Sequence, residues 1–116
     1  MNTNNTINYI EMPVADIVAT QQFFAQVFGW EFIDYGSEYT CFKNAGIAGG
    51  FFLSDQFFDL AKGMPLVVLY SSQLETSMAR VEGAGGEVSK AIFSFPGGRR
   101  FHFKDPSGNE YAVWSE

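Results

Sequence analysis

Apolar and polar residues alternate along residues 7–16, INYIEMPVAD, near the start of the chain. Ile10 and Met12 fall on one side of an extended chain, and Tyr9 and Glu11 fall on the other. A period of two is typical of a strand with one buried face. The pattern therefore predicts a strand that packs its apolar side against helices and turns Tyr9 and Glu11 to the opposite face.

The same order of signals occurs twice in the chain. Asp16 can cap a helix that ends at Gly29, and at an offset of 57 positions residues 64–73 take the place of residues 7–16. Short runs after each helix predict three further strands per half: EFIDY, EYTCFK and IAGGFFL, then GGEVS, RRFHFK and EYAVW. The order β-α-β-β-β therefore predicts an α+β fold of two tandem modules, residues 6–55 and 64–116, in one domain of residues 1–116.

Composition narrows the classes of partner. A chain of 116 residues with 47% hydrophobic residues is large enough for one real core. Its net charge of −6 argues against nucleic acid, which needs clustered Lys and Arg. Cys41 has no second cysteine for an internal disulfide, and the polar start MNTNNTINYI lacks the features of a signal peptide. We therefore expect a cytoplasmic protein, and no membrane span, because the apolar run MPLVVLY is far shorter than about 20 residues.

The repeat resembles the vicinal oxygen chelate superfamily, which includes glyoxalases, bleomycin resistance proteins and extradiol dioxygenases. The resemblance rests on IEMPVAD, FFAQVFGWEF, ARVEGAGGEV and FKDPSGNEYAVW in this order, and it covers residues 7–114. It implies that each module curls its sheet into half of a U-shaped cavity, with a small-molecule ligand between the halves. It also implies a homodimer, because members of this size commonly dimerise to complete or cover the cleft.

Enzymes of this superfamily hold a divalent metal at defined positions of the repeat. Those positions correspond here to Tyr9, Gly50, Leu66 and Ala112, and none of them carries a ready metal ligand. A transition metal typically needs three or more converging N, O or S donors. We therefore expect no metal cofactor at the usual positions and favour a protein that binds a small molecule without one.

Several side chains are candidates for the chemistry of such a cavity. Glu11 is the candidate catalytic residue, because enclosure would suit a carboxylate to general-base work or to a cationic ligand. The alternative is an ion pair that merely closes the sheet. By alternation, Tyr70 and Trp114 are expected on the same face as Tyr9, where they would line a cleft or belong to the ordinary aromatic core.

The segment RRFHFK contains the only histidine of the chain. It places Arg100 and His102 on one strand face and Phe101 and Phe103 on the other, and the pattern leaves open which face lines the cavity. The first face would hold an anionic ligand, although a lone histidine on a strand is more often structural. The candidate ligand-binding set is therefore Tyr9, Glu11, Tyr70, Arg100, His102 and Trp114.

Three classes of function remain open at this point. The first is a metal-independent small-molecule-binding protein, which we favour. The second is a lyase, isomerase or dioxygenase-like enzyme that uses Glu11 or a metal at a displaced site. The third is an interaction module whose cleft is filled by its own side chains.

Overall fold

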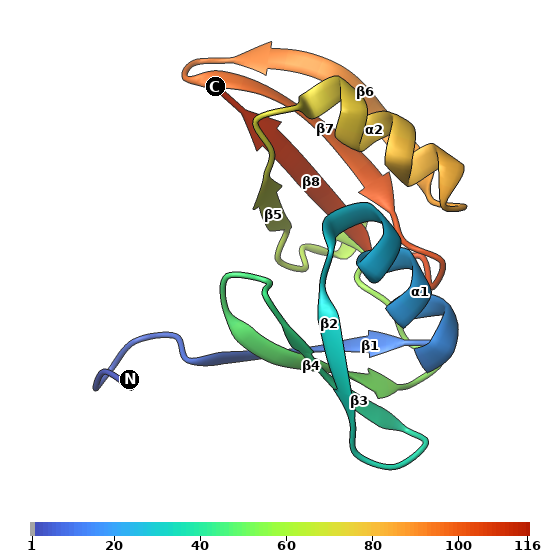
Figure 1. The fold of residues 1–116 in the computed structure, drawn as a ribbon. Coiled ribbons are helices and arrows are strands. Elements are labelled where there is room, and N and C mark those ends of the chain that lie inside the picture. The colour runs from blue at the N-terminus through green and yellow to red at the C-terminus, as the bar shows by residue number, and fades with distance from the viewer. Residues whose placement is uncertain (1) are drawn as a thin grey trace.

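The computed structural model describes residues 2–116 and contains two four-stranded sheets, each with one helix (Figure 1). The first module runs β1 (Tyr9–Val14), α1 (Ile17–Phe28), β2 (Glu31–Asp34), β3 (Tyr39–Lys43) and β4 (Ala48–Leu53). A short 3-10 helix, η1 (Leu60–Lys62), lies in the connection. The second module runs β5 (Val67–Tyr70), α2 (Leu74–Gly83), β6 (Glu87–Phe95), β7 (Gly98–Lys104) and β8 (Glu110–Ser115). The predicted α+β fold with a repeated β-α-β-β-β order is confirmed.

The two sheets have the same topology. The first sheet has the order β1-β4-β3-β2 and the second the order β5-β8-β7-β6. In each, the first strand of the module pairs in parallel with the last strand, and the other pairs are antiparallel. As a result, β1 and β5 are edge strands, and each leaves one row of backbone groups without a partner strand in its sheet.

The first helix begins and ends where the sequence predicts. The Asp16 side chain accepts a hydrogen bond from the Ala19 backbone N–H at 3.0 Å, which caps the first turn. Gly29 ends the helix with a φ of 74°, and its N–H donates to the Ala25 carbonyl at 3.0 Å. Within residues 2–116, neither this helix nor α2 is long and apolar enough to cross a membrane.

One hydrophobic core joins the helix-facing sides of both sheets. Phe24 of α1 is fully buried, and its ring centroid lies 5.4 Å from that of Phe51 in the first sheet and 5.3 Å from that of Tyr111 in the second. Burying one such side chain stabilises the fold by about 1.5–3 kcal/mol. Figure 1 shows α1 between the two sheets, consistent with these contacts. The side of each sheet away from the helices, called its open face below, therefore lies outside this core.

A buried asparagine in the last hairpin ties the second module to the first. Asn109 is fully buried, and its side-chain oxygen accepts a hydrogen bond from the Phe58 N–H at 2.7 Å. Its amide nitrogen donates to the Pro13 carbonyl, also at 2.7 Å. Nearby, the Ala15 N–H donates to the Ser107 hydroxyl at 2.9 Å. These bonds connect the β7–β8 turn to the segment between β4 and β5, which contains Phe58, and to the end of β1. They therefore hold the two modules against each other.

Candidate functional site

A chain of hydrogen bonds occupies the open face of the first sheet. The Tyr39 hydroxyl donates to the Glu11 carboxylate at 2.8 Å, and the Tyr9 hydroxyl lies 2.5 Å from that of Tyr39. Because the Tyr39 proton is directed to Glu11, the Tyr9 hydroxyl is the donor to Tyr39. Burial, together with the bonds to Tyr9 and Glu11, raises the pKa of Tyr39 well above its usual range. This face therefore carries a hydrogen-bonded chain of two phenol groups that ends at the exposed Glu11 carboxylate.

Four of the six predicted ligand-binding residues lie on the second sheet, and all four are on its open face. Arg100 pairs with Trp114 across β7 and β8, and the Tyr70 ring centroid lies 5.1 Å from that of Trp114. His102 is the fourth. Phe101 and Phe103 point to the other side of β7 and are fully buried in the core. The structure thus places Arg100 and His102 on the open face, and none of these four side chains of β7 lines the pocket described below.

His102 is held by a carboxylate that the sequence analysis missed. Its Nδ1 atom lies 2.9 Å from the Glu110 carboxylate, and the His102 side chain is only 7% exposed. The two residues lie on neighbouring strands, because His102 pairs with Ala112 in the register of β7 and β8. Glu110 and Ala112 are two positions apart and share a strand face. The contact between His102 and Glu110 could therefore be predicted only from the register of β7 and β8, which the sequence does not give.

The structure thus separates the six predicted residues into two groups. Tyr9 and Glu11 lie on the open face of the first sheet, whereas the other four lie on the open face of the second. The helix-facing sides of both sheets meet in the same core. A single chain therefore does not gather all six around one cavity.

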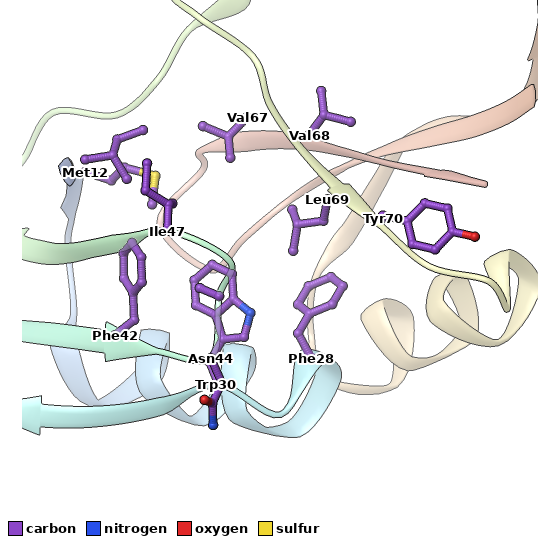
Figure 2. A pocket seen from close by; sticks show the side chains of 12 residues that line it. Met12, Phe28, Trp30, Phe42, Asn44, Ile47, Val67, Val68, Leu69 and Tyr70 are labelled. Carbon is purple, nitrogen blue, oxygen red and sulfur yellow. The ribbon is translucent and has the colours of Figure 1, made fainter. Parts of the chain in front are cut away.

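A pocket of about 400 Å³ lies at the boundary between the modules (Figure 2). The first module contributes side chains from the helix-facing side of its sheet, from the end of α1 and from the β3–β4 turn, and the second contributes the whole of β5. Its lining residues are Ile10, Met12, Phe28, Trp30, Phe42, Asn44, Ala45, Ile47, Val67, Val68, Leu69 and Tyr70. Apart from Asn44, Trp30, Tyr70 and the weakly accepting sulfur of Met12, these side chains have no hydrogen-bonding group, so the pocket is predominantly apolar.

Only Tyr70 among the six predicted residues lines this pocket. Figure 2 shows Tyr70 at one end of it and Met12 and Phe42 at the other, with Trp30 and Leu69 between them. From the alternation we expected Ile10 and Met12 in the core and Tyr9 and Glu11 at the cavity. The alternation itself is as predicted, but the pocket lies on the helix-facing side of β1, between Ile10 and Met12 and the strand β5.

The comparisons with known proteins identify the class of this fold. The model of the Glyoxalase/Bleomycin resistance protein/Dioxygenase superfamily matches residues 6–113. The chain therefore belongs to this superfamily. No curated protein matches the chain.

Several solved structures share the fold. A glyoxalase-related enzyme from Fulvimarina pelagi is 17% identical, with a TM-score of 0.81 over 97% of this chain and 88% of that one. The fosfomycin resistance protein FosX from Listeria monocytogenes is 19% identical, with a TM-score of 0.80 over 98% and 95% of the two chains. A glyoxalase/bleomycin resistance protein/dioxygenase family enzyme from Burkholderia phytofirmans PsJN is 18% identical, with a TM-score of 0.78 over 93% and 96%. At these identities the likeness extends to the fold alone.

The residues at the superfamily's metal positions do not form a donor set for a divalent metal. A Cβ atom added to Gly50 would overlap the Tyr39 hydroxyl, so Tyr39 fills the space that a ligating side chain at this position would need. Ala112 is fully buried and pairs with Val68 on β5. Among residues 2–116, no three His, Cys, Asp or Glu side chains are grouped so as to hold a metal ion. Gly50 and Ala112 therefore offer no side-chain donor to a metal ion.

Proposed function

We propose that this protein binds a small, mainly apolar molecule in the pocket between its two modules, without a divalent metal at the superfamily's usual positions. The observation that carries the proposal is the pocket itself. Its volume of about 400 Å³ lies within the usual range of ligand sites, about 300–1,000 Å³, and both modules line it with apolar side chains.

The lining also defines the chemical class of the ligand. Trp30 and Phe42 are 7% and 3% exposed, and they present aromatic rings to the pocket, whereas Val68 is 45% exposed at its edge. A ligand that buries about 200 Å² of apolar surface gains about 5 kcal/mol at 25 cal/mol per Å². Trp30, Asn44 and Tyr70 carry the polar groups of the lining, so one or two hydrogen-bonding groups on an apolar body fit best.

We also propose that the protein is a homodimer and that it is cytoplasmic. Val68 and Tyr70 are 45% and 51% exposed on the edge strand β5, and Tyr9 is 42% exposed on the edge strand β1. Apolar residues on edge strands support a homodimer in which a second copy covers them. The single cysteine, Cys41, supports a cytoplasmic location.

A thermal-unfolding experiment with a blocking variant tests the proposal. The probes are toluene and cyclohexanol, added to chelator-treated protein. Val67→Phe adds volume inside the pocket, and Val18→Phe, at a 59% exposed position of α1 outside the pocket, is the matched control. At ten times its Kd a probe stabilises the native state by about 1.4 kcal/mol, which corresponds to a rise of about 5 °C in midpoint for a chain of this size. We expect this rise in the wild type and in Val18→Phe but not in Val67→Phe.

Metal independence is tested on the same stripped protein. We expect micromolar Zn²⁺, Ni²⁺, Mn²⁺ and Fe²⁺ to leave the unfolding midpoint unchanged, because a metal that binds only the native state must raise it. A clear rise with any of them would contradict the metal-free part of the proposal. It would direct attention to a displaced metal site.

An acid–base enzyme is the second candidate, and the hydrogen-bonded chain from Tyr9 through Tyr39 to Glu11 favours it. A positioned carboxylate next to two phenols is suited to proton transfer. If Glu11 is the base, the protein accelerates exchange of the α-protons of an enolisable ketone such as cyclohexanone with D₂O. Glu11→Gln should then abolish the exchange, while the fold and the affinity for the ketone survive. Retained exchange in this variant would exclude Glu11 as the base.

A further inference from the structure

A second polar cluster lies on the open face of the second sheet, and it shares no residue with the lining of the apolar pocket. At its centre is His102, whose Nδ1 is bonded to Glu110 at 2.9 Å. The Nε2 atom of the same ring is buried and has no hydrogen-bond partner within residues 2–116. Buried polar groups are nearly always paired, so a nitrogen in this state needs an explanation.

Arg100, two positions away on the same strand face, is also without a partner. Its Nε atom is buried and unbonded, and neither of the two ion pairs in the described part of the chain includes it. Its guanidinium lies over two rings of β6, 5.3 Å from the Phe93 centroid and 5.7 Å from that of Phe95. A fully charged side chain is therefore held against aromatic rings without a carboxylate.

The Phe93 ring lies beside all three basic side chains of the cluster. Its ring centroid lies 5.9 Å from that of His102, and the Lys90 ammonium stands 4.8 Å from the same Phe93 ring. Two cations and the histidine thus surround one phenyl ring. Cation–π contacts therefore hold both Arg100 and Lys90 at this ring.

The strand that carries Phe93 is irregular at this point. β6 is an edge strand, and its pairing with β7 shifts register between Val88 and Lys90 and again between Lys90 and Phe93. Irregularities of this kind interrupt the ladder of hydrogen bonds and re-aim side chains. Phe93 is therefore the first regularly paired residue after an irregular stretch of β6.

We propose that this cluster is a binding site for an oxyanion, a carboxylate or a phosphate group, and that Phe93 is its gate. The oxyanion accepts hydrogen bonds from Arg100 and Lys90, which leave the phenyl ring to meet it. It also accepts a hydrogen bond from Nε2–H of His102 when the ring is doubly protonated, or a hydrogen phosphate donates its own O–H to Nε2 of the neutral ring. Glu110 is a positioning residue, because it holds the ring by Nδ1 and directs Nε2 toward the site.

The single histidine makes the test specific, since every histidine ring signal in an NMR spectrum belongs to His102. The probes are inorganic phosphate and benzoate, with neutral benzamide as the control, all at constant ionic strength. We expect a saturable shift of the His102 ring signals with at least one anion and none with benzamide. The anion that binds more tightly identifies the group that the site takes.

Three variants distinguish anion binding at this site from nonspecific attraction of anions to positive charge. Arg100→Gln should weaken anion binding at least tenfold, the loss expected for a hydrogen bond to a charged group. Phe93→Ala should tighten it about fivefold or more, because no ring has to be displaced. Arg99→Gln is the matched control, since Arg99 is adjacent but is paired with Glu75 at 2.6 Å, and it should change the affinity less than twofold.

The proposal is overturned if neither anion gives a saturable shift in the wild type or in Phe93→Ala. It is also overturned if Arg100→Gln and Arg99→Gln weaken binding equally, or if Phe93→Ala weakens it while circular dichroism shows an intact fold. Because toluene binding is measured at a different pocket, these outcomes leave the proposed function unaffected.

Discussion

The most quantitative prediction concerns Asp105, which begins the turn between β7 and β8. Its carboxyl is 4% exposed, and its Oδ1 atom accepts hydrogen bonds from the Ser107 and Asn109 N–H groups, each at 2.9 Å. Burial raises the pKa of Asp105 from 3.8 to about 6, although these hydrogen bonds oppose the rise. The native state therefore favours the protonated carboxyl more strongly than the unfolded state does.

The sign and size of the effect on stability follow from this difference. The contribution of Asp105 to the free energy of unfolding is fully present below pH 3.8 and is lost as the pH rises through about 6. At about 1.4 kcal/mol per pH unit, the interval between 3.8 and about 6 corresponds to about 3 kcal/mol. At pH 7 the buried carboxylate thus makes the protein less stable by about this amount than it would be with a neutral group.

Asp105→Asn removes the charge and keeps the shape, and its amide oxygen can still accept the bonds from Ser107 and Asn109. We expect the free energy of unfolding of the variant minus that of the wild type to rise by about 3 kcal/mol between pH 3.5 and pH 7.5, mostly between pH 4 and pH 6. Urea unfolding across this pH range measures the difference, and circular dichroism checks that the variant keeps the fold. A difference that stays constant or falls with pH would refute the assignment of a buried, charge-destabilised carboxylate.

Two further variants test the packing around the module boundary and the first sheet. Asn109→Ala leaves the Phe58 N–H and the Pro13 carbonyl without their partner. We expect urea unfolding to show a free energy of unfolding lower by about 3 kcal/mol. A loss below about 1 kcal/mol would show that these bonds do not hold the modules together. Gly50→Ala places a methyl group against the Tyr39 hydroxyl, and the overpacking should lower the free energy of unfolding by about 1–3 kcal/mol. Unchanged stability would mean that Tyr39 moves aside freely.

Local signals in the sequence predict most of the fold. The alternation of Ile10 and Met12 with Tyr9 and Glu11 gives the correct face for each side chain of β1, because the period of two is a property of the strand alone. The cap at Asp16 and the left-handed Gly29 likewise depend only on neighbouring residues, so the bounds of α1 follow from them. The repeat then supplies the order of elements in the second module.

The candidate site depends on contacts that no local pattern contains. Ile10 and Val67 line the pocket only because β5 stands apart from the helix-facing side of β1, and this spacing is set by how the modules pack. The pairing of His102 with Glu110 depends on the register between β7 and β8. The position of Tyr39 over Gly50 similarly requires β3 and β4 to be aligned.

The measurement that tests the central claim most directly locates an apolar molecule in the protein by NMR. Toluene is added to chelator-treated protein, and nuclear Overhauser effects are recorded from its protons to the two indole N–H groups, which Trp30→Phe assigns. The account predicts contacts with Trp30, which lines the pocket, none with Trp114, and their loss in Val67→Phe. Contacts with Trp114 alone, or none at saturating toluene, would contradict the claim that the pocket between the modules is the binding site.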